Sequence, residues 1–197
     1  MTQNHSRLVP YQALSRGLRS TKLAAAAALL CAAIGSLESR AAAQQAPQPC
    51  LAPEFRQMDF WLGNWTVEWD AAPGVPSGSG TNRITREYGG CVIVEAFDGG
   101  AASGNLIGHS VSTYQAPLQR WRQTWVDNQG GYFAFIGGRE GDRFILVTTR
   151  PGDSVPVQRM VFEDISADRL TWRWQRTPDG GTTWSDQWVI RYRRTAA

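Results

Sequence analysis

The sequence is poor in residues that carry several common chemistries. Lys22 is its single lysine, and His5 and His109 are its two histidines. Five of the 20 basic residues and one of the 17 acidic residues precede Gln44, so the rest of the chain holds 15 arginines, 16 acids and a net charge of −1. These arginines are scattered through strand-like segments, which argues against the basic face that nucleic-acid binding requires.

The scarcity of histidine also argues against metal, haem and serine-hydrolase chemistry. No histidine follows His109, and a site of the Ser-His-Asp type needs a positioned histidine base. Ser110 is adjacent to His109, but adjacent residues on a strand point to opposite faces of the sheet. We therefore predict no metal site and no cofactor, and we assign no catalytic residue from this pattern.

A single long apolar run is present at residues 23–35, after a basic leader and before Ala41-Ala42-Ala43. This order is typical of a secretory signal peptide. The run is shorter than the roughly 20 residues that a membrane-spanning helix needs. We expect residues 1–43 to be a signal peptide and residues 44–197 to form a single domain, periplasmic or secreted and without a membrane anchor after cleavage. A retained N-terminal anchor is the alternative.

Cys50 and Cys91 remain after the expected cleavage. In an oxidising compartment a pair of cysteines most simply forms a disulfide. Closing a loop of about 40 residues would stabilise the fold by roughly 4 kcal/mol. A free buried thiol or thiol chemistry is the alternative, but no Cys-x-x-Cys spacing supports a redox site.

Amphipathic helices of ordinary length are missing, and short alternating runs take their place. A helical turn is predicted over residues 53–62, because Pro53 and Glu54 suit a helix start. Trp65, Val67 and Trp69 then alternate with polar residues, as in a half-buried strand. Further strands are predicted at residues 81–88, 91–97, 106–115, 120–127, 132–136, 143–149, 157–165, 169–177 and 184–193. Turns are predicted at Gly89-Gly90, Gly137-Gly138, Gly141-Asp142 and Asp179-Gly180-Gly181.

This succession of strands excludes a βαβ architecture and favours an all-β fold. About ten consecutive antiparallel strands fit an up-and-down β-barrel, which closes on itself and so removes its sheet edges. A two-sheet sandwich is the alternative.

The segment Gly63-Asn64-Trp65, which follows the predicted helical turn, resembles the Gly-x-Trp signature of lipocalin-like (calycin-type) barrels. Together with it, the stretches "RQMDFWLGNW", "TNRI", "GGCVIVE", "RWRQTWVDNQGG" and "PDGGTTW" are similar to an exported bacterial lipocalin-like family with no established function. The resemblance extends from Cys50 to Tyr192 and implies a fold but no reaction. The stretch "GHSVSTYQAP" departs from the family pattern and leaves the role of His109 open.

In barrels of this kind the signature tryptophan closes one end, and an arginine near the end of the last strand packs across it. The resemblance therefore implies a contact between Trp65 and one of three arginines. The candidates are Arg191, Arg193 and Arg194. Alternation along the last strand favours Arg194.

The stretch "TPDGGTTW" also matches the Asp-box of sialidase propellers. Propellers need several copies at a regular period, and one copy is present. We interpret Asp179 as a turn residue that caps a hairpin, with Trp184 packed beneath it.

Tryptophan is the residue type that points most clearly to a site. Eight tryptophans form pairs at i, i+2 or i, i+4 spacing on four strands, so each pair shares one face. If these faces converge inside the barrel, they form an aromatic cavity of about 300 Å³ or more, as small-molecule sites commonly do. The predicted ligand-binding residues are Trp65, Trp69, Glu95, Trp121, Gln123, Trp125, Trp172, Trp174 and Trp188. A core filled by large side chains is the alternative.

The favoured function is an exported module that binds a small apolar or aromatic molecule. One alternative is an enzyme of the same fold that uses Glu95 or Asp127 as its acid or base. Asp127 is in phase with Gln123, so we expect both to face inward. Another alternative is a structural or interaction barrel with a filled core. The sequence leaves the ligand's identity and the oligomeric state open.

Overall fold

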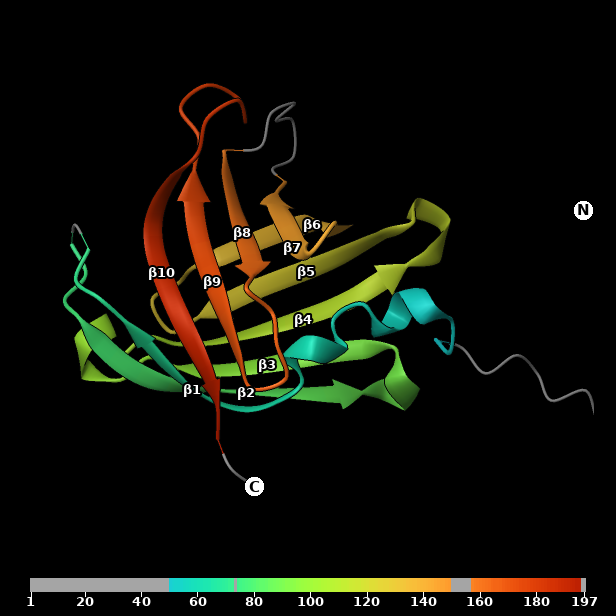
Figure 1. Ribbon diagram of the computed structural model, residues 1–197, viewed down its shortest axis with the longest axis horizontal. Helices are drawn as coiled ribbons and strands as arrows, with labels where there is room; N and C mark the ends of the chain where they lie inside the picture. Colours follow the sequence, from blue (N-terminus) through green and yellow to red (C-terminus); the bar gives the residue numbers. More distant parts are fainter. Residues whose placement is uncertain (1–49, 73, 150–156, 196–197) are drawn as a thin grey trace, which may run out of the picture. The chain divides into compact units, whose positions relative to one another are not determined.

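The computed structural model describes residues 50–72, 74–149 and 157–195. The signal peptide predicted for residues 1–43 lies outside the described residues. Ten antiparallel strands form a closed barrel in which each strand pairs with its sequence neighbour and β1 pairs with β10 (Figure 1). The strands are β1 (Gly63–Trp69), β2 (Gly78–Glu87), β3 (Val92–Asp98), β4 (Ile107–Gln115), β5 (Arg120–Asp127), β6 (Tyr132–Glu140), β7 (Arg143–Thr148), β8 (Gln158–Glu163), β9 (Arg169–Arg176) and β10 (Ser185–Arg194).

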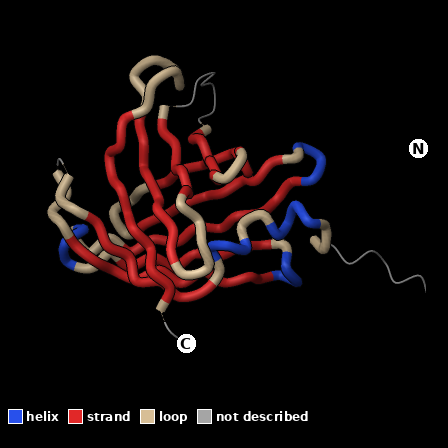
Figure 2. The backbone as a smooth tube through the Cα atoms, viewed as in Figure 1, coloured by secondary structure: helices blue, strands red, loops and turns tan. Residues whose placement is uncertain are grey.

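Short 3₁₀ helices connect the strands or precede them, and Figure 2 shows them in blue at the ends of the red strands. They are η1 (Pro53–Arg56), η2 (Asp59–Trp61), η3 (Tyr88–Gly90), η4 (Ala101–Ser103) and η5 (Ala116–Leu118). The predicted helical turn before the first strand is therefore two 3₁₀ turns, η1 and η2. None of the helices among the described residues is long and apolar enough to cross a membrane.

The predicted all-β, up-and-down barrel of about ten strands is confirmed, and the sandwich alternative is wrong. One predicted turn is also wrong, because Gly137-Gly138 lies inside β6. A Cβ atom on Gly137 would come within 1.9 Å of the Ile145 carbonyl oxygen on β7. Glycine is needed there for close approach of two strands, and the turn between them is at Gly141-Asp142.

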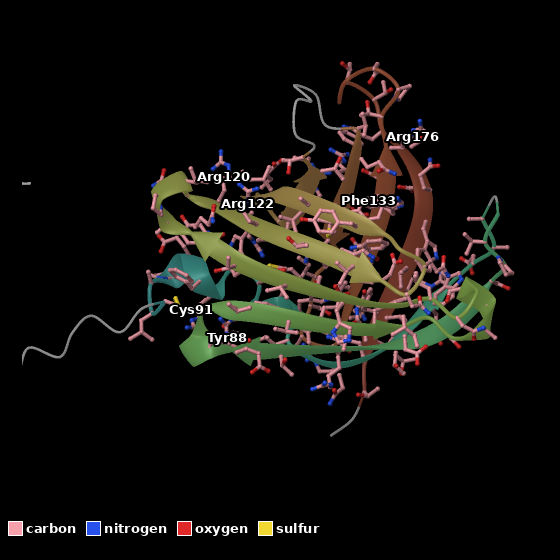
Figure 3. All side chains as sticks on the ribbon, turned by 180° about the vertical axis from the view of Figure 1, so that it is seen from behind. Tyr88, Cys91, Arg120, Arg122, Phe133 and Arg176 are labelled. Atoms are coloured by element: carbon pink, nitrogen blue, oxygen red, sulfur yellow. A yellow bond between two sulfur atoms is a disulfide. The ribbon has the colours of Figure 1, made fainter. Side chains whose placement is uncertain are left out.

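A disulfide fastens the N-terminal segment to the barrel. Cys50 and Cys91 are bonded, with Cα atoms 5.0 Å apart, as predicted. The Arg56 guanidinium donates to the Cys50 carbonyl at 2.8 Å, and Arg86 donates to the Phe55 carbonyl at 3.2 Å. Figure 3 shows Cys91 and Arg120 at this end of the molecule, with Arg176 at the other end. We call it the closed end, because η1 and η2 lie across the barrel here.

The Gly-x-Trp segment has a clear structural role at the closed end. Trp65 is 1% exposed, and the guanidinium carbon of Arg194 lies 4.1 Å from the centre of its ring. Gly63 has a φ of +117°, and a Cβ atom there would come within 2.3 Å of an Arg194 nitrogen. Glycine therefore permits both the backbone conformation and the approach of the arginine. Of the three candidate arginines, Arg194 is the one that lies over Trp65.

The turn between β9 and β10 is the predicted Asp-box hairpin. One carboxylate oxygen of Asp179 accepts from the Thr183 backbone N–H and from the Thr177 hydroxyl, each at 2.8 Å. Hydrogen bonds from Thr183 and Thr177 lower the pKa of Asp179 to about 2. Trp184 donates its indole N–H to the Gly181 carbonyl at 3.0 Å, so Asp179 and Trp184 are turn residues.

Candidate ligand-binding site

The barrel contains a cavity of about 220 Å³ on the side away from the closed end. Its lining residues come from β3, β5, β6, β8, β9 and β10, from η2 and from the residue just before β4. The lining residues are Trp61, Glu95, Phe97, Leu106, Trp125, Asp127, Phe133, Phe135, Met160, Trp172, Trp174, Trp188, Ile190 and Tyr192. We call this end of the barrel the cavity end.

Five of the nine predicted ligand-binding residues line this cavity. They are Glu95, Trp125, Trp172, Trp174 and Trp188. They lie on β3, β5, β9 and β10, and Trp172 and Trp174 share one face of β9 because residues two apart on a strand point to the same side. Four tryptophans from three strands and Glu95 therefore border one cavity, and their role in ligand binding stays a prediction.

The other four predicted residues are buried in packed parts of the barrel and are not among the lining residues. Trp65 lies under Arg194 at the closed end, and Trp121 packs edge-on against Phe144 with ring centres 6.0 Å apart. Trp69 packs edge-on against Trp188 at 5.1 Å. These three indoles contact the barrel's own side chains where we expected them to contact a ligand.

Gln123 faces inward, as its phase on β5 predicted, but it also lies outside the cavity lining. Its amide nitrogen donates to the Ser112 hydroxyl at 2.8 Å. Gln123 is therefore a buried polar group that is hydrogen-bonded within the protein, as buried polar groups usually are.

The cavity is smaller than the volume of 300 Å³ or more that we expected. Large inward-facing side chains fill the rest of the barrel, including Trp65, Trp121 and Phe162. An apolar cavity of about 150 Å³ is large enough to hold benzene. A cavity of about 220 Å³ therefore suits a molecule of about two fused rings.

Aromatic rings form most of the cavity wall. The Trp172 and Trp174 rings are parallel, with centres 6.3 Å apart. Trp174 meets Phe133 edge-on at 5.5 Å. Trp172 meets Trp188 edge-on at 6.2 Å. Such edge-to-face contacts favour defined ring orientations, so the wall presents a shaped aromatic surface.

A glycine makes room for one of these indoles. Trp125 lies against β4 at Gly108, where a Cβ atom would come within 2.0 Å of the Trp125 Cζ2 atom. Any other residue at position 108 would therefore force the indole away from the wall and into the cavity. Trp125 is also held by Asp127, whose carboxylate accepts its indole N–H at 2.8 Å.

The cavity floor, on the side of η2, carries a buried polar network. Glu95 is 6% exposed. Its two carboxyl oxygens contact the Ser110 hydroxyl at 2.6 Å and the Asn82 amide nitrogen at 2.7 Å. Asn82 also donates to the Tyr192 hydroxyl oxygen at 3.0 Å. Burial raises the pKa of Glu95 to about 7, and the hydrogen bonds from Ser110 and Asn82 oppose that rise.

Asp127 lines the cavity, but its carboxylate is hydrogen-bonded to the turn between β5 and β6. Its carboxylate accepts from the backbone N–H groups of Gln129 and Gly131, at 2.9 and 2.8 Å, as well as from Trp125. Burial raises its pKa, but these hydrogen bonds outweigh burial and lower the pKa overall. Asp127 is therefore an anion that positions Trp125.

Sequence reasoning missed several cavity residues. Phe97 is in phase with Glu95 on β3, and Phe133 and Phe135 share a face of β6, so alternation alone could have identified all three. Tyr192 is two residues beyond Ile190 on β10 and was available by the same argument. Trp61 carried no such signal, because it reaches the cavity from η2 and not from a strand.

His109 is exposed on the outer surface of β4, on the opposite face of the sheet from Glu95 and Ser110. Among the residues that the structure describes, no three histidine, cysteine or acidic side chains gather as a metal site would require. Comparison with protein-family models and with curated proteins finds no match to this chain. The cavity itself is therefore the basis for assigning a function.

Proposed function

We propose that this chain is an exported, lipocalin-like binding module that holds a small apolar or aromatic molecule in its barrel cavity. The observation that carries the proposal is the aromatic cavity of about 220 Å³ in a barrel whose other end is closed by η1, η2 and Trp65. A pocket with apolar walls and a few fixed polar groups is the usual form of a small-molecule site.

Two further features support this proposal. The Cys50–Cys91 disulfide suits an oxidising compartment, as expected for an exported protein. In addition, the lining combines eleven apolar side chains with three polar ones, Glu95, Asp127 and Tyr192, which suits a ligand that is mostly apolar.

Tryptophan fluorescence tests the proposal. Naphthalene titrated into the purified protein should quench the fluorescence saturably, because Trp125, Trp172 and Trp174 line the cavity. Trp125→Ala should weaken binding at least tenfold. Trp184→Ala is the matched control, because Trp184 belongs to the β9–β10 turn, and it should leave the affinity unchanged. An absence of saturable binding over a broad set of apolar and aromatic compounds would reject the proposal.

The pKa of Glu95 supports a second candidate, an enzyme that uses this carboxyl as acid and base. A carboxyl group with a pKa of about 7 is poised for proton transfer near neutral pH. Asp127 is the poorer candidate, because its pKa is lowered. Deuterium exchange at the methyl group of 2-acetonaphthone tests whether Glu95 acts as such a base. Exchange that matches buffer alone, or that survives Glu95→Gln, would reject it.

A further inference from the structure

Glu95 places a carboxyl group in the wall of a mostly apolar cavity. It lines the cavity and is 6% exposed. One carboxyl oxygen accepts from the Asn82 amide at 2.7 Å, and the other lies 2.6 Å from the Ser110 hydroxyl. Both partners are uncharged, so neither neutralises the carboxylate that forms when Glu95 loses its proton.

The cationic side chains on the inward face of the barrel are bound elsewhere. None of the lining residues is an arginine, a lysine or a histidine. Arg86 shares the inward face of β2 with Asn82, but its guanidinium is bound at the closed end to Asp59 and to two backbone carbonyls. Arg194 lies over Trp65 at the same end. An ionised Glu95 therefore has no counter-ion among the residues that border the cavity with it.

Glu95 is the titratable lining residue that changes its charge near neutral pH. Burial raises its pKa to about 7, although the hydrogen bonds from Ser110 and Asn82 oppose that rise. Burial also acts on Asp127, but its hydrogen bonds outweigh burial and lower its pKa, so it stays ionised. Burial and the neighbouring Glu95 raise the pKa of Tyr192, so its hydroxyl stays neutral. The charge of the lining in this pH range therefore depends on Glu95.

The hydrogen bonds of Glu95 suit both of its protonation states. A serine hydroxyl both donates and accepts. The Ser110 hydroxyl can donate to the carboxylate, or it can accept from the protonated acid across the same 2.6 Å. The Asn82 amide donates to the other oxygen in either state. Protonation therefore changes the charge of the cavity wall without requiring a new arrangement of side chains.

An apolar ligand favours the neutral state of Glu95. A carboxylate without a counter-ion depends on water for stabilisation, and burying it away from water is costly. A ligand that fills the cavity of about 220 Å³ excludes water from Glu95 and offers no hydrogen bond in return. This loss affects the carboxylate far more than the neutral acid. Binding therefore raises the pKa of Glu95 further, and protonation strengthens binding by the same factor.

We propose that ligand binding in this cavity is coupled to protonation of Glu95, so that the protein binds its ligand at acidic pH and releases it as the pH rises. This inference rests on the proposed binding function and adds the regulation of that site. A carboxylate at position 95 takes up a proton from solution when the ligand binds and returns it when the ligand leaves. The affinity is highest below about pH 7, where the free protein already holds the proton, and it falls as the pH rises above that value.

Naphthalene tests the coupling, because it has no titratable group and any pH dependence of its affinity belongs to the protein. Equilibrium dialysis gives its affinity at about pH 5.5 and about pH 8.5. The affinity should be weaker at the higher pH by about fivefold or more, as expected if binding raises the pKa of Glu95 by about one unit.

Two glutamine variants connect the pH dependence to Glu95. Glu95→Gln should bind naphthalene equally well at both pH values, because glutamine is neutral and can keep both hydrogen bonds, accepting from Asn82 and donating to Ser110. Glu68→Gln is the matched control. Glu68 is an exposed glutamate on the outer face of β1, so this variant should keep the pH dependence of the unaltered protein.

A measurement on the unaltered protein keeps the test valid if Glu95→Gln fails to fold. Titration calorimetry with naphthalene at about pH 7.5, in phosphate and in Tris, should give heats that differ by the ionisation enthalpy of the buffers. The difference should correspond to an uptake of about half a proton per ligand bound.

The outcomes separate the coupling from the binding function. Equal affinity at the two pH values without proton uptake, or tighter binding at the higher pH, would overturn the inference and leave the binding function standing. Proton uptake that persists in Glu95→Gln would do the same. An absence of saturable binding by a broad set of apolar and aromatic compounds at both pH values would overturn both.

Discussion

The two ends of the barrel use the same residue type for different purposes. At the closed end, Trp65 donates its indole N–H to the Trp61 carbonyl at 2.8 Å and is covered by the Arg194 guanidinium. At the cavity end, Trp172, Trp174 and Trp188 line open space, and the buried N–H of Trp188 has no acceptor among the described residues. Tryptophan content alone therefore does not distinguish packing from binding.

The two ends differ in which side chains and elements pack against the indole rings. The closed end receives η1, η2 and the side chain of Arg194, whose guanidinium donates to the Leu62 and Phe60 carbonyls. At the cavity end, Gly108 has no side chain, so the Trp125 indole packs against the barrel wall and leaves the interior open. An indole that protein atoms surround on all sides is structural, and an indole that borders the cavity is available to a ligand.

The largest expected effect comes from truncating one tryptophan at each end. Trp65→Ala should lower the free energy of unfolding by about 4 kcal/mol, because it leaves a large void in a packed core and removes the partner of Arg194. Trp174→Ala should cost about 1–2 kcal/mol, because this indole is partly exposed and borders a cavity that already exists. Urea unfolding of the two variants measures both. Equal losses would show that the two ends are packed alike.

The next effect concerns the polar floor. Burial raises the pKa of Glu95 from 4.5 to about 7. The unfolded chain releases this proton near pH 4.5, whereas the folded chain keeps it until about pH 7. The free energy of unfolding should therefore fall by up to roughly 3 kcal/mol as the pH rises through this window, and then level off.

Glu95→Gln should remove this slope, because glutamine does not titrate. The acids with lowered pKa values, such as Asp127 and Asp179, act in the opposite direction and below about pH 4. Urea unfolding at several pH values between 4.5 and 8 therefore isolates Glu95. A slope that persists in the variant would place the titrating group elsewhere.

The smallest expected effect on stability comes from Gly108→Ala, a substitution that should narrow the cavity. The added methyl group would push the Trp125 indole inward, with a loss of about 1–2 kcal/mol of stability. Naphthalene affinity should fall at least tenfold, because the displaced indole occupies the ligand's space. Gly138→Ala is the control, because a Cβ atom there meets nothing within 4 Å. Equal affinity in the two variants would show that the ligand binds away from Trp125.

Much of the fold could be predicted from the sequence, because its signals are local. Alternation on β1 separates buried Trp65, Val67 and Trp69 from exposed Glu68, and the Asp179 turn follows from its glycines and threonines. The turn expected at Gly137-Gly138 was wrong, because glycine tolerates both a turn and the close approach of two strands. The choice between these uses depends on β7, which is a tertiary partner.

The site was predicted less completely, for a related physical reason. Alternation along a strand shows which side chains face inward, and Trp125, Trp172 and Trp174 line the same cavity. It does not show at which height along the barrel a side chain lies, or whether another element fills the space beside it. Trp121 faces inward but meets Phe144 near the closed end, and Trp61 enters from η2.

The most direct test of the central claim is a crystal structure of the protein soaked with 2-bromonaphthalene, with the bromine located by its anomalous scattering. The binding account predicts one strong bromine peak inside the barrel, with the rings between Trp125 and Trp174. It also predicts that the closed end around Trp65 and Arg194 stays unchanged. An empty cavity at saturating ligand, or bromine on the outer surface alone, would contradict the account.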